Sequence, residues 1–134
     1  MKVLVTGGLG FIGSNFILKL LDDKNDFSVI NVDAEFNGSE HRNLSKIKNH
    51  ENYSFVKGNI TNAKLMEKLI SNVDVVINFA AESFVDRSIL NANPFLVSNI
   101  RGTYTILELL KKQKKRFLQI STDEVYGSLK TDTA

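Results

Sequence analysis

The segment KVLVTGGLGFIG, residues 2–13, decides the fold that we predict for this chain. Residues 2–6 are a short β-branched run typical of a strand, and apolar residues recur at helical spacing from Phe11 to Leu21. Between them, Gly7, Gly10 and Gly13 have the spacing G-x-x-G-x-x-G. A glycine turn between a strand and a helix predicts a site where backbone N–H groups and the helix N-terminus bind a diphosphate.

An acidic residue strengthens this interpretation. A second buried strand is predicted over residues 27–32, and Asp33 follows it, twenty residues after Gly13. An acid at this point accepts hydrogen bonds from an adenosine ribose and repels a 2′-phosphate, so the pattern favours NAD over NADP. The alternative is that the glycines serve only a turn and that Asp33 only ends a strand.

The rest of the chain alternates predicted strands and helices. Further strands are expected at 53–57, 73–79 and 117–121, and further helices from a Thr61 cap to Ile70, over 84–92, and from Phe95 to Lys112, with Pro94 interrupting the last two. This alternation predicts one α/β domain over residues 1–134, a doubly wound parallel sheet of the Rossmann type with about five strands in the order 3-2-1-4-5. The ligand cleft should lie between strands 1 and 4.

Composition excludes several classes of site. The 134 residues are 43% hydrophobic with a net charge of +2, which calls for neither nucleic acid nor a membrane surface. There is no cysteine, and His41 and His50 lack any metal-ligand spacing, so we predict no metal site. The basic residues at 111–116 are interpreted as a solvated helix end rather than a nucleic-acid patch. Without a signal peptide at Met1, we expect a cytoplasmic protein.

A second motif, STDEVYG at residues 121–127, lies at the exit of the fifth predicted strand, which we expect to be buried. It places the Thr122 hydroxyl beside the carboxyl groups of Asp123 and Glu124. Two neighbouring carboxyl groups held in opposite protonation states by burial and mutual repulsion can act as a general acid and a general base. The alternative is that Asp123 caps a turn and Glu124 is solvated.

Taken together, these segments resemble the extended short-chain dehydrogenase/reductase family, and within it the dTDP-glucose 4,6-dehydratases. The resemblance covers essentially the whole chain. The Thr-Asp-Glu triplet is its most discriminating part, because related epimerases and decarboxylases lack the Asp-Glu pairing. The matching segments are 5–15, 31–33, 80–83, 85–89, Asn99 with Gly102 and Thr103, and 121–127.

The resemblance implies NAD-dependent dehydration of a nucleotide-linked hexose, most simply dTDP-glucose to dTDP-4-keto-6-deoxyglucose, a lyase step of deoxysugar biosynthesis. Glu124 would be the base at C5, Asp123 the acid for the C6 hydroxyl, and Thr122 and Ser83 would contact the substrate. The full-length protein would be a homodimer. The cofactor-binding set would be Gly7, Gly10, Phe11, Ile12, Gly13, Asp33, Ala34, Asn59, Ile60, Phe79, Ala80, Ala81, Ser83 and Ser98.

Three departures from the family pattern qualify this expectation. Phe84 replaces a histidine, and Asn59 and Asn62 replace acids. The catalytic Tyr-x-x-x-Lys of the family is missing, because the string from Tyr126 to Lys130 coincides with the Val-Tyr-Gly element. We therefore expect a chain truncated at its C-terminus, without a substrate domain, that alone binds NAD weakly and is inactive. A nucleotide-sugar epimerase or decarboxylase, or a non-catalytic NAD-binding module, remains an alternative, and the nucleotide (dTDP or UDP) is open.

Overall fold

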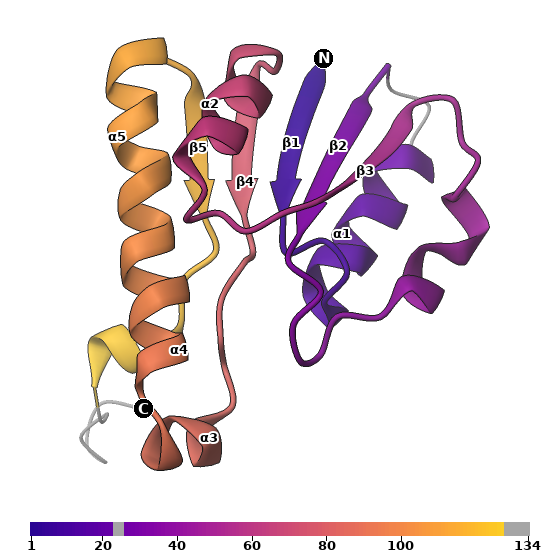
Figure 1. The fold of residues 1–134 in the computed structure, drawn as a ribbon. Coiled ribbons are helices and arrows are strands. Elements are labelled where there is room, and N and C mark those ends of the chain that lie inside the picture. The colour runs from indigo at the N-terminus through magenta and orange to yellow at the C-terminus, as the bar shows by residue number, and fades with distance from the viewer. Residues whose placement is uncertain (23–25, 128–134) are drawn as a thin grey trace, which may run out of the picture.

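The computed structural model describes residues 1–22 and 26–127, which form a parallel sheet between two layers of helices (Figure 1). The strands lie in the order β3-β2-β1-β4-β5, which confirms the predicted topology. Their carboxyl ends meet at one edge, and the order reverses between β1 and β4. The strands are β1 (Lys2–Thr6), β2 (Ser28–Asp33), β3 (Tyr53–Lys57), β4 (Val75–Asn78) and β5 (Arg116–Gln119).

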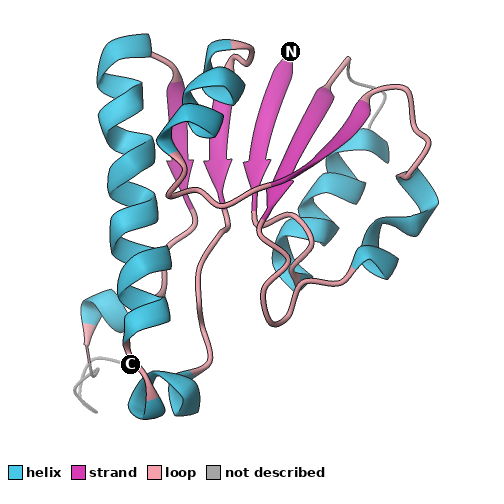
Figure 2. Ribbon diagram, in the orientation of Figure 1, coloured by secondary structure: helices cyan, strands magenta, loops and turns pink. Residues whose placement is uncertain are grey.

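Alternate residues of the central strand β1 pack on opposite faces of the sheet, as Figure 2 illustrates with its two helical layers. Val3 and Val5 contact the layer formed by α1 (Phe11–Asp22) and the short 3-10 helix η1 (His41–Ile47). Leu4 packs in the opposite core with α2 (Ala63–Ser71) and α5 (Thr103–Gln113). A sheet covered on both faces explains why the middle of β1 and most of β4 are apolar.

Two helix boundaries differ in detail from the prediction. Asn62, not Thr61, caps α2, because its side chain accepts a hydrogen bond from Leu65 N at 3.2 Å. The chain does break after α3 (Val85–Leu90), but Pro94 lies in the first turn of the next helix, where its missing N–H costs nothing. That helix runs through α4 (Asn93–Phe95), a π-helical stretch η2 (Leu96–Gly102) and α5.

Several apolar residues at helical spacing are exposed. Phe11 and Ile12 are 81% and 63% exposed because the first turn of α1 faces the carboxyl edge of the sheet, so only the later turns of α1 pack in the core. On the helix that ends in α5, Leu110 is buried but Tyr104 and Leu107 are exposed. The expected buried fifth strand is wrong. As an edge strand, β5 has a single neighbour, and its residues are exposed or half-buried.

Candidate functional site at the carboxyl edge of the sheet

The glycine turn is wedged between the ends of two neighbouring strands. Gly7 has φ of +69°, and a Cβ placed there would lie 2.6 Å from the backbone nitrogen of Ala80. Its N–H donates to the Val32 carbonyl of β2 at 2.9 Å. A Cβ at Gly13 would lie 2.5 Å from the Gly7 carbonyl oxygen, so the first turn of α1 can close onto the loop only without a side chain. The turn therefore brings backbone and helix N-terminus together at the switch point of the sheet.

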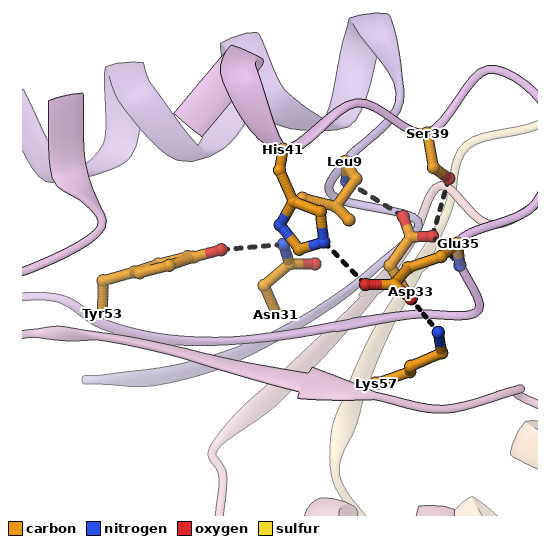
Figure 3. A network of polar contacts seen from close by, with 8 residues as sticks. All are labelled: Leu9, Asn31, Asp33, Glu35, Ser39, His41, Tyr53 and Lys57. Carbon is orange, nitrogen blue, oxygen red and sulfur yellow. Dashed lines mark hydrogen bonds and ion pairs between the residues drawn. The ribbon is translucent and has the colours of Figure 1, made fainter. Parts of the chain in front are cut away.

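Asp33, at the end of β2, is buried and tied to this turn (Figure 3). Its Oδ2 accepts a hydrogen bond from Leu9 N at 2.9 Å. Its Oδ1 accepts hydrogen bonds from Glu35 N at 2.8 Å and from the Ser39 hydroxyl at 2.7 Å. A carboxylate has about four acceptor sites, so these three bonds leave capacity for a further donor.

A second buried side chain of β2, that of Asn31, supports the glycine turn. Asn31 accepts a hydrogen bond from Gly8 N at 3.1 Å and donates to the Tyr53 hydroxyl at 3.0 Å (Figure 3). Burial raises the pKa of Tyr53, partly offset by the hydrogen bond from Asn31, with a smaller raising effect from the Asp33 charge. The β-branched pattern of β2 gave no sign of this polar support.

Beside Asp33 lies a cluster of three charged or titratable side chains, which Figure 3 shows converging. Glu35 forms an ion pair with Lys57, and one of its carboxylate oxygens lies 2.6 Å from Nε2 of His41. The hydrogen bond from Lys57 and then that from His41 hold the pKa of Glu35 below its usual value. Lys57 is the residue of β3 paired with Asp33 in the sheet, so the cluster flanks that carboxylate.

A chain of hydrogen bonds crosses from β1 to β5. The Thr6 hydroxyl donates to Asn78 Oδ1, and Asn78 Nδ2 donates to Gln119 Oε1 at 2.8 Å. Thr6 and Asn78 are fully buried. The side chains of three neighbouring strands are thus joined immediately before the loops that carry the two sequence motifs.

These loops enclose one cleft of about 960 Å³ along the carboxyl edge of the sheet. Every residue of the predicted cofactor set lines it, and so do Thr122 and Asp123. The glycine turn and the acidic motif therefore open onto common space. Lining residues that the sequence reasoning did not select include Phe36, Asn37, Gly38, Ser39, Glu82, Phe84, Asn99, Thr103, Gln119, Ile120, Ser121 and Val125.

The acidic motif lies on an exposed part of the cleft. Thr122 and Asp123 are both exposed, and the Thr122 hydroxyl lies 3.2 Å from Asp123 Oδ1, to which it donates. The burial expected for this carboxyl group is therefore not seen. Glu124 lies in the 3-10 helix η3 (Asp123–Tyr126), but its side chain is outside the described structure, as is Lys130. Tyr126 is 85% exposed.

The family profile of GDP-mannose 4,6 dehydratase matches residues 4–134. This chain belongs to that family. It is 51% identical over 130 residues to the low-salt glycan biosynthesis protein Agl12 of Haloferax volcanii, covering 96% of this chain and 42% of that protein. The predicted resemblance to nucleotide-sugar 4,6-dehydratases is thereby confirmed at the family level.

Solved structures of family members have the same fold. The dTDP-glucose 4,6-dehydratase of Bacillus anthracis in complex with NAD superposes with a TM-score of 0.87 at 45% identity, covering 98% of this chain and 40% of that one. The dTDP-glucose 4,6-dehydratase DesIV of Streptomyces venezuelae, with NAD and TYD bound, gives a TM-score of 0.91 at 40% identity, covering 98% and 42%. The chain thus spans about 40% of the length of these relatives.

Within residues 1–22 and 26–127, no three His, Cys, Asp or Glu side chains gather where they could hold a metal ion. None of the helices described has the length and hydropathy needed to cross a bilayer. His41 begins η1 and packs edge-on against Phe55, with 5.0 Å between ring centroids.

One missed contact links the loop after β4 to the long helix. Glu82 N donates to Asn99 Oδ1 at 2.8 Å, and Asn99 Nδ2 donates back to the Glu82 carbonyl at 2.9 Å. Asn99 was among the residues that matched the family, which is the signal that could have pointed to this role. The paired bonds hold the loop that contains Ala80, Ala81 and Ser83 against the cleft.

Proposed function

We propose that this chain is the NAD-binding part of a nucleotide-sugar 4,6-dehydratase that converts dTDP-glucose to dTDP-4-keto-6-deoxyglucose. The observation that carries the proposal is the shared cleft, lined by the glycine turn and by Thr122 and Asp123. The two dTDP-glucose 4,6-dehydratases reported above support the choice of NAD and of a dTDP-sugar.

The residues at the first half of the cleft fit a dinucleotide. Positions 7 and 13 leave no room for a side chain, which keeps the backbone of the turn open to a pyrophosphate beside the start of α1. Asp33 retains an acceptor site for a ribose hydroxyl, and Asn59 and Ile60 border the adenine side. When bound there, NAD supplies an acceptor for the hydride from C4 of the sugar.

The other half of the cleft provides the proton transfers. Thr122 contacts the substrate near O4, with Ser83 across the cleft. Asp123 reaches the cleft and donates a proton to the hydroxyl that leaves C6. Glu124, the next residue of η3, removes the C5 proton that the 4-keto group has made acidic. Separate groups on a single short helix thus serve as acid and base.

The proposal extends to assembly and location. We propose that residues 1–134 form one dinucleotide-binding domain of the enzyme. In a homodimer of the full-length protein, a second copy would cover an exposed apolar row spaced along one helix, Leu96, Ile100, Tyr104 and Leu107. The near-neutral charge supports an enzyme of small metabolites without a nucleic-acid partner, and we propose that this enzyme is cytoplasmic.

The test is to incubate the protein expressed from the complete gene with dTDP-glucose and NAD, and to analyse the sugar nucleotide by mass spectrometry and NMR. A dehydratase yields a 4-keto-6-deoxy sugar that has lost one water. Inversion at C4 without a mass change would indicate an epimerase instead, and loss of carbon dioxide from a uronic acid analogue would indicate a decarboxylase. Binding of NAD without any turnover would leave a non-catalytic module.

A further inference from the structure

The side chains of Lys57 and His41 flank the place where Asp33 would bind the adenosine ribose, and both contact the carboxylate of Glu35. Lys57 is paired with Asp33 across the β2–β3 ladder, and its ammonium forms an ion pair with Glu35. The other oxygen of Glu35 lies 2.6 Å from Nε2 of His41. The Lys57 and His41 side chains are 69% and 61% exposed, so Glu35 holds them at the molecular surface beside the cleft.

The backbone conformation of Glu35 places this residue between Asp33 and the side chains of Lys57 and His41. It has φ of +57°, in the left-handed region that non-glycine residues seldom adopt. In this conformation the N–H of Glu35 donates to Asp33 Oδ1 at 2.8 Å. Its side chain extends to Lys57 and His41. Glu35 therefore contacts Asp33 through its backbone and the neighbouring Lys57 and His41 through its side chain.

Hydrogen bonds to the Asp33 carboxylate weaken its repulsion of a 2′-phosphate. Its two carboxylate oxygens accept hydrogen bonds from two backbone N–H groups and the Ser39 hydroxyl, which disperse its negative charge. A 2′-phosphate carries a charge of about −2 and binds readily to clustered cations. Without Glu35, the Lys57 ammonium would be free to pair with such a phosphate, and the His41 imidazole would lie beside it.

We propose that Glu35 is a specificity-determining residue, which enforces selection of NAD over NADP by keeping Lys57 and His41 engaged. The proposal rests on the function proposed above, because it requires the adenosine ribose to lie at Asp33. Glu35 does not itself line the cleft, so it acts through Lys57 and His41, which its carboxylate contacts.

The experiment compares the affinities of the chain for NAD⁺ and NADP⁺, measured by NMR titration or calorimetry, before and after Glu35→Gln. Glutamine keeps the size of the side chain but removes the negative charge that pairs with the Lys57 ammonium. We expect the ratio of NADP⁺ to NAD⁺ affinity to rise roughly fivefold to tenfold, in line with one or two solvent-exposed charge pairs. The gain should shrink at high salt, which screens such exposed charges.

A matched control lies in the same loop. Glu40 pairs with Arg42 at 3.1 Å and does not line the cleft, so Glu40→Gln removes the same charge without freeing Lys57 or His41. It should leave the affinity ratio unchanged. Adding Lys57→Met to Glu35→Gln should abolish the gain, which tests whether the freed ammonium is responsible.

The outcomes separate the two proposals. If wild-type chain binds NAD⁺ but Glu35→Gln changes the ratio no more than Glu40→Gln, the role of Glu35 is wrong and the function stands. If the double variant keeps the full gain in the ratio of NADP⁺ to NAD⁺ affinity, Lys57 is not the group that Glu35 restrains. If the wild-type chain binds neither dinucleotide, the proposed function fails and the role of Glu35 fails with it.

Discussion

Two aspartates at the two ends of one cleft have opposite surroundings. Asp33 is 5% exposed and accepts three hydrogen bonds from the protein. Asp123 is exposed and accepts a hydrogen bond from the neighbouring Thr122. The region around Asp33 is built from central strands and a glycine turn, whereas Asp123 follows an edge strand.

The difference indicates which half of the cleft is formed in advance. The dinucleotide half is fixed by buried hydrogen bonds that exist before any ligand arrives, so changes there should act mainly on folding and binding. The acidic half contributes few contacts to the fold, so changes there should act on chemistry alone. Asn78 joins the halves through Thr6 and Gln119.

The largest expected effect is on turnover. Asp123→Asn should lower kcat of the full-length enzyme at least about 100-fold, because an amide cannot supply the proton for the C6 hydroxyl. Thermal stability and NAD affinity should remain those of the wild type. The measurement is the rate of 4-keto product formation, with Asp22→Asn at the exposed end of α1 as the control. A loss of less than about threefold would remove Asp123 from the chemistry.

The next effect concerns folding. Gly7→Ala should lower the free energy of unfolding by about 2–4 kcal/mol, since it adds left-handed strain to a collision with the Ala80 backbone. Gly127 is the matched control. It has φ of +70°, but a Cβ there meets nothing within 4 Å, so Gly127→Ala should cost only the left-handed strain of about 1–2 kcal/mol. Urea denaturation measures both, and equal costs would contradict the proposed asymmetry.

The connection between the halves should have an intermediate effect. Asn78→Ala leaves the Thr6 hydroxyl and Gln119 Oε1 without the partners they have in the sheet. We expect a loss of about 1–3 kcal/mol in the free energy of unfolding, because Thr6 and Asn78 are fully buried. If denaturant unfolding of this variant matches the wild type, the bridge does not stabilise the sheet.

The smallest effect is a pH dependence specific to the dinucleotide half. Because the pKa of Tyr53 is raised in the folded state, the stability that Tyr53 contributes is fully present below its unfolded pKa of 10.0. This stability is lost as the pH rises through the folded-state pKa. Tyr53→Phe should reduce this alkaline loss of stability, seen as urea midpoints at about pH 8 and pH 11. An unchanged alkaline loss in the variant would show that Tyr53 does not cause it.

Much of the fold could be predicted because its signals are local. The run 2–6, the glycine spacing and the apolar fourth strand each follow from strand or turn chemistry, and alternation with helices fixed the sheet order. The errors came from tertiary context. The fifth strand was expected to be buried, yet it lies at the edge of the sheet with a single neighbour, so its residues are exposed or half-buried.

The candidate site was predictable where a motif marked it and not where partners are distant in sequence. The glycines, Asp33 and Asp123 were identified, and all line the cleft. Asn31 and Asn78 were not, because their partners lie 22 to 72 residues away and leave no local pattern. The helix η1 was missed because its polar sequence has no helical period.

The most direct measurement is a titration of the chain with NAD⁺, followed by amide chemical shifts at both ends of the cleft. If the two motifs face a common ligand, the signals of Gly10 and Gly13 and those of Ser121 and Asp123 will shift with a single dissociation constant. If only the glycine signals respond, or if the two sets follow different constants, the acidic motif does not share the dinucleotide site.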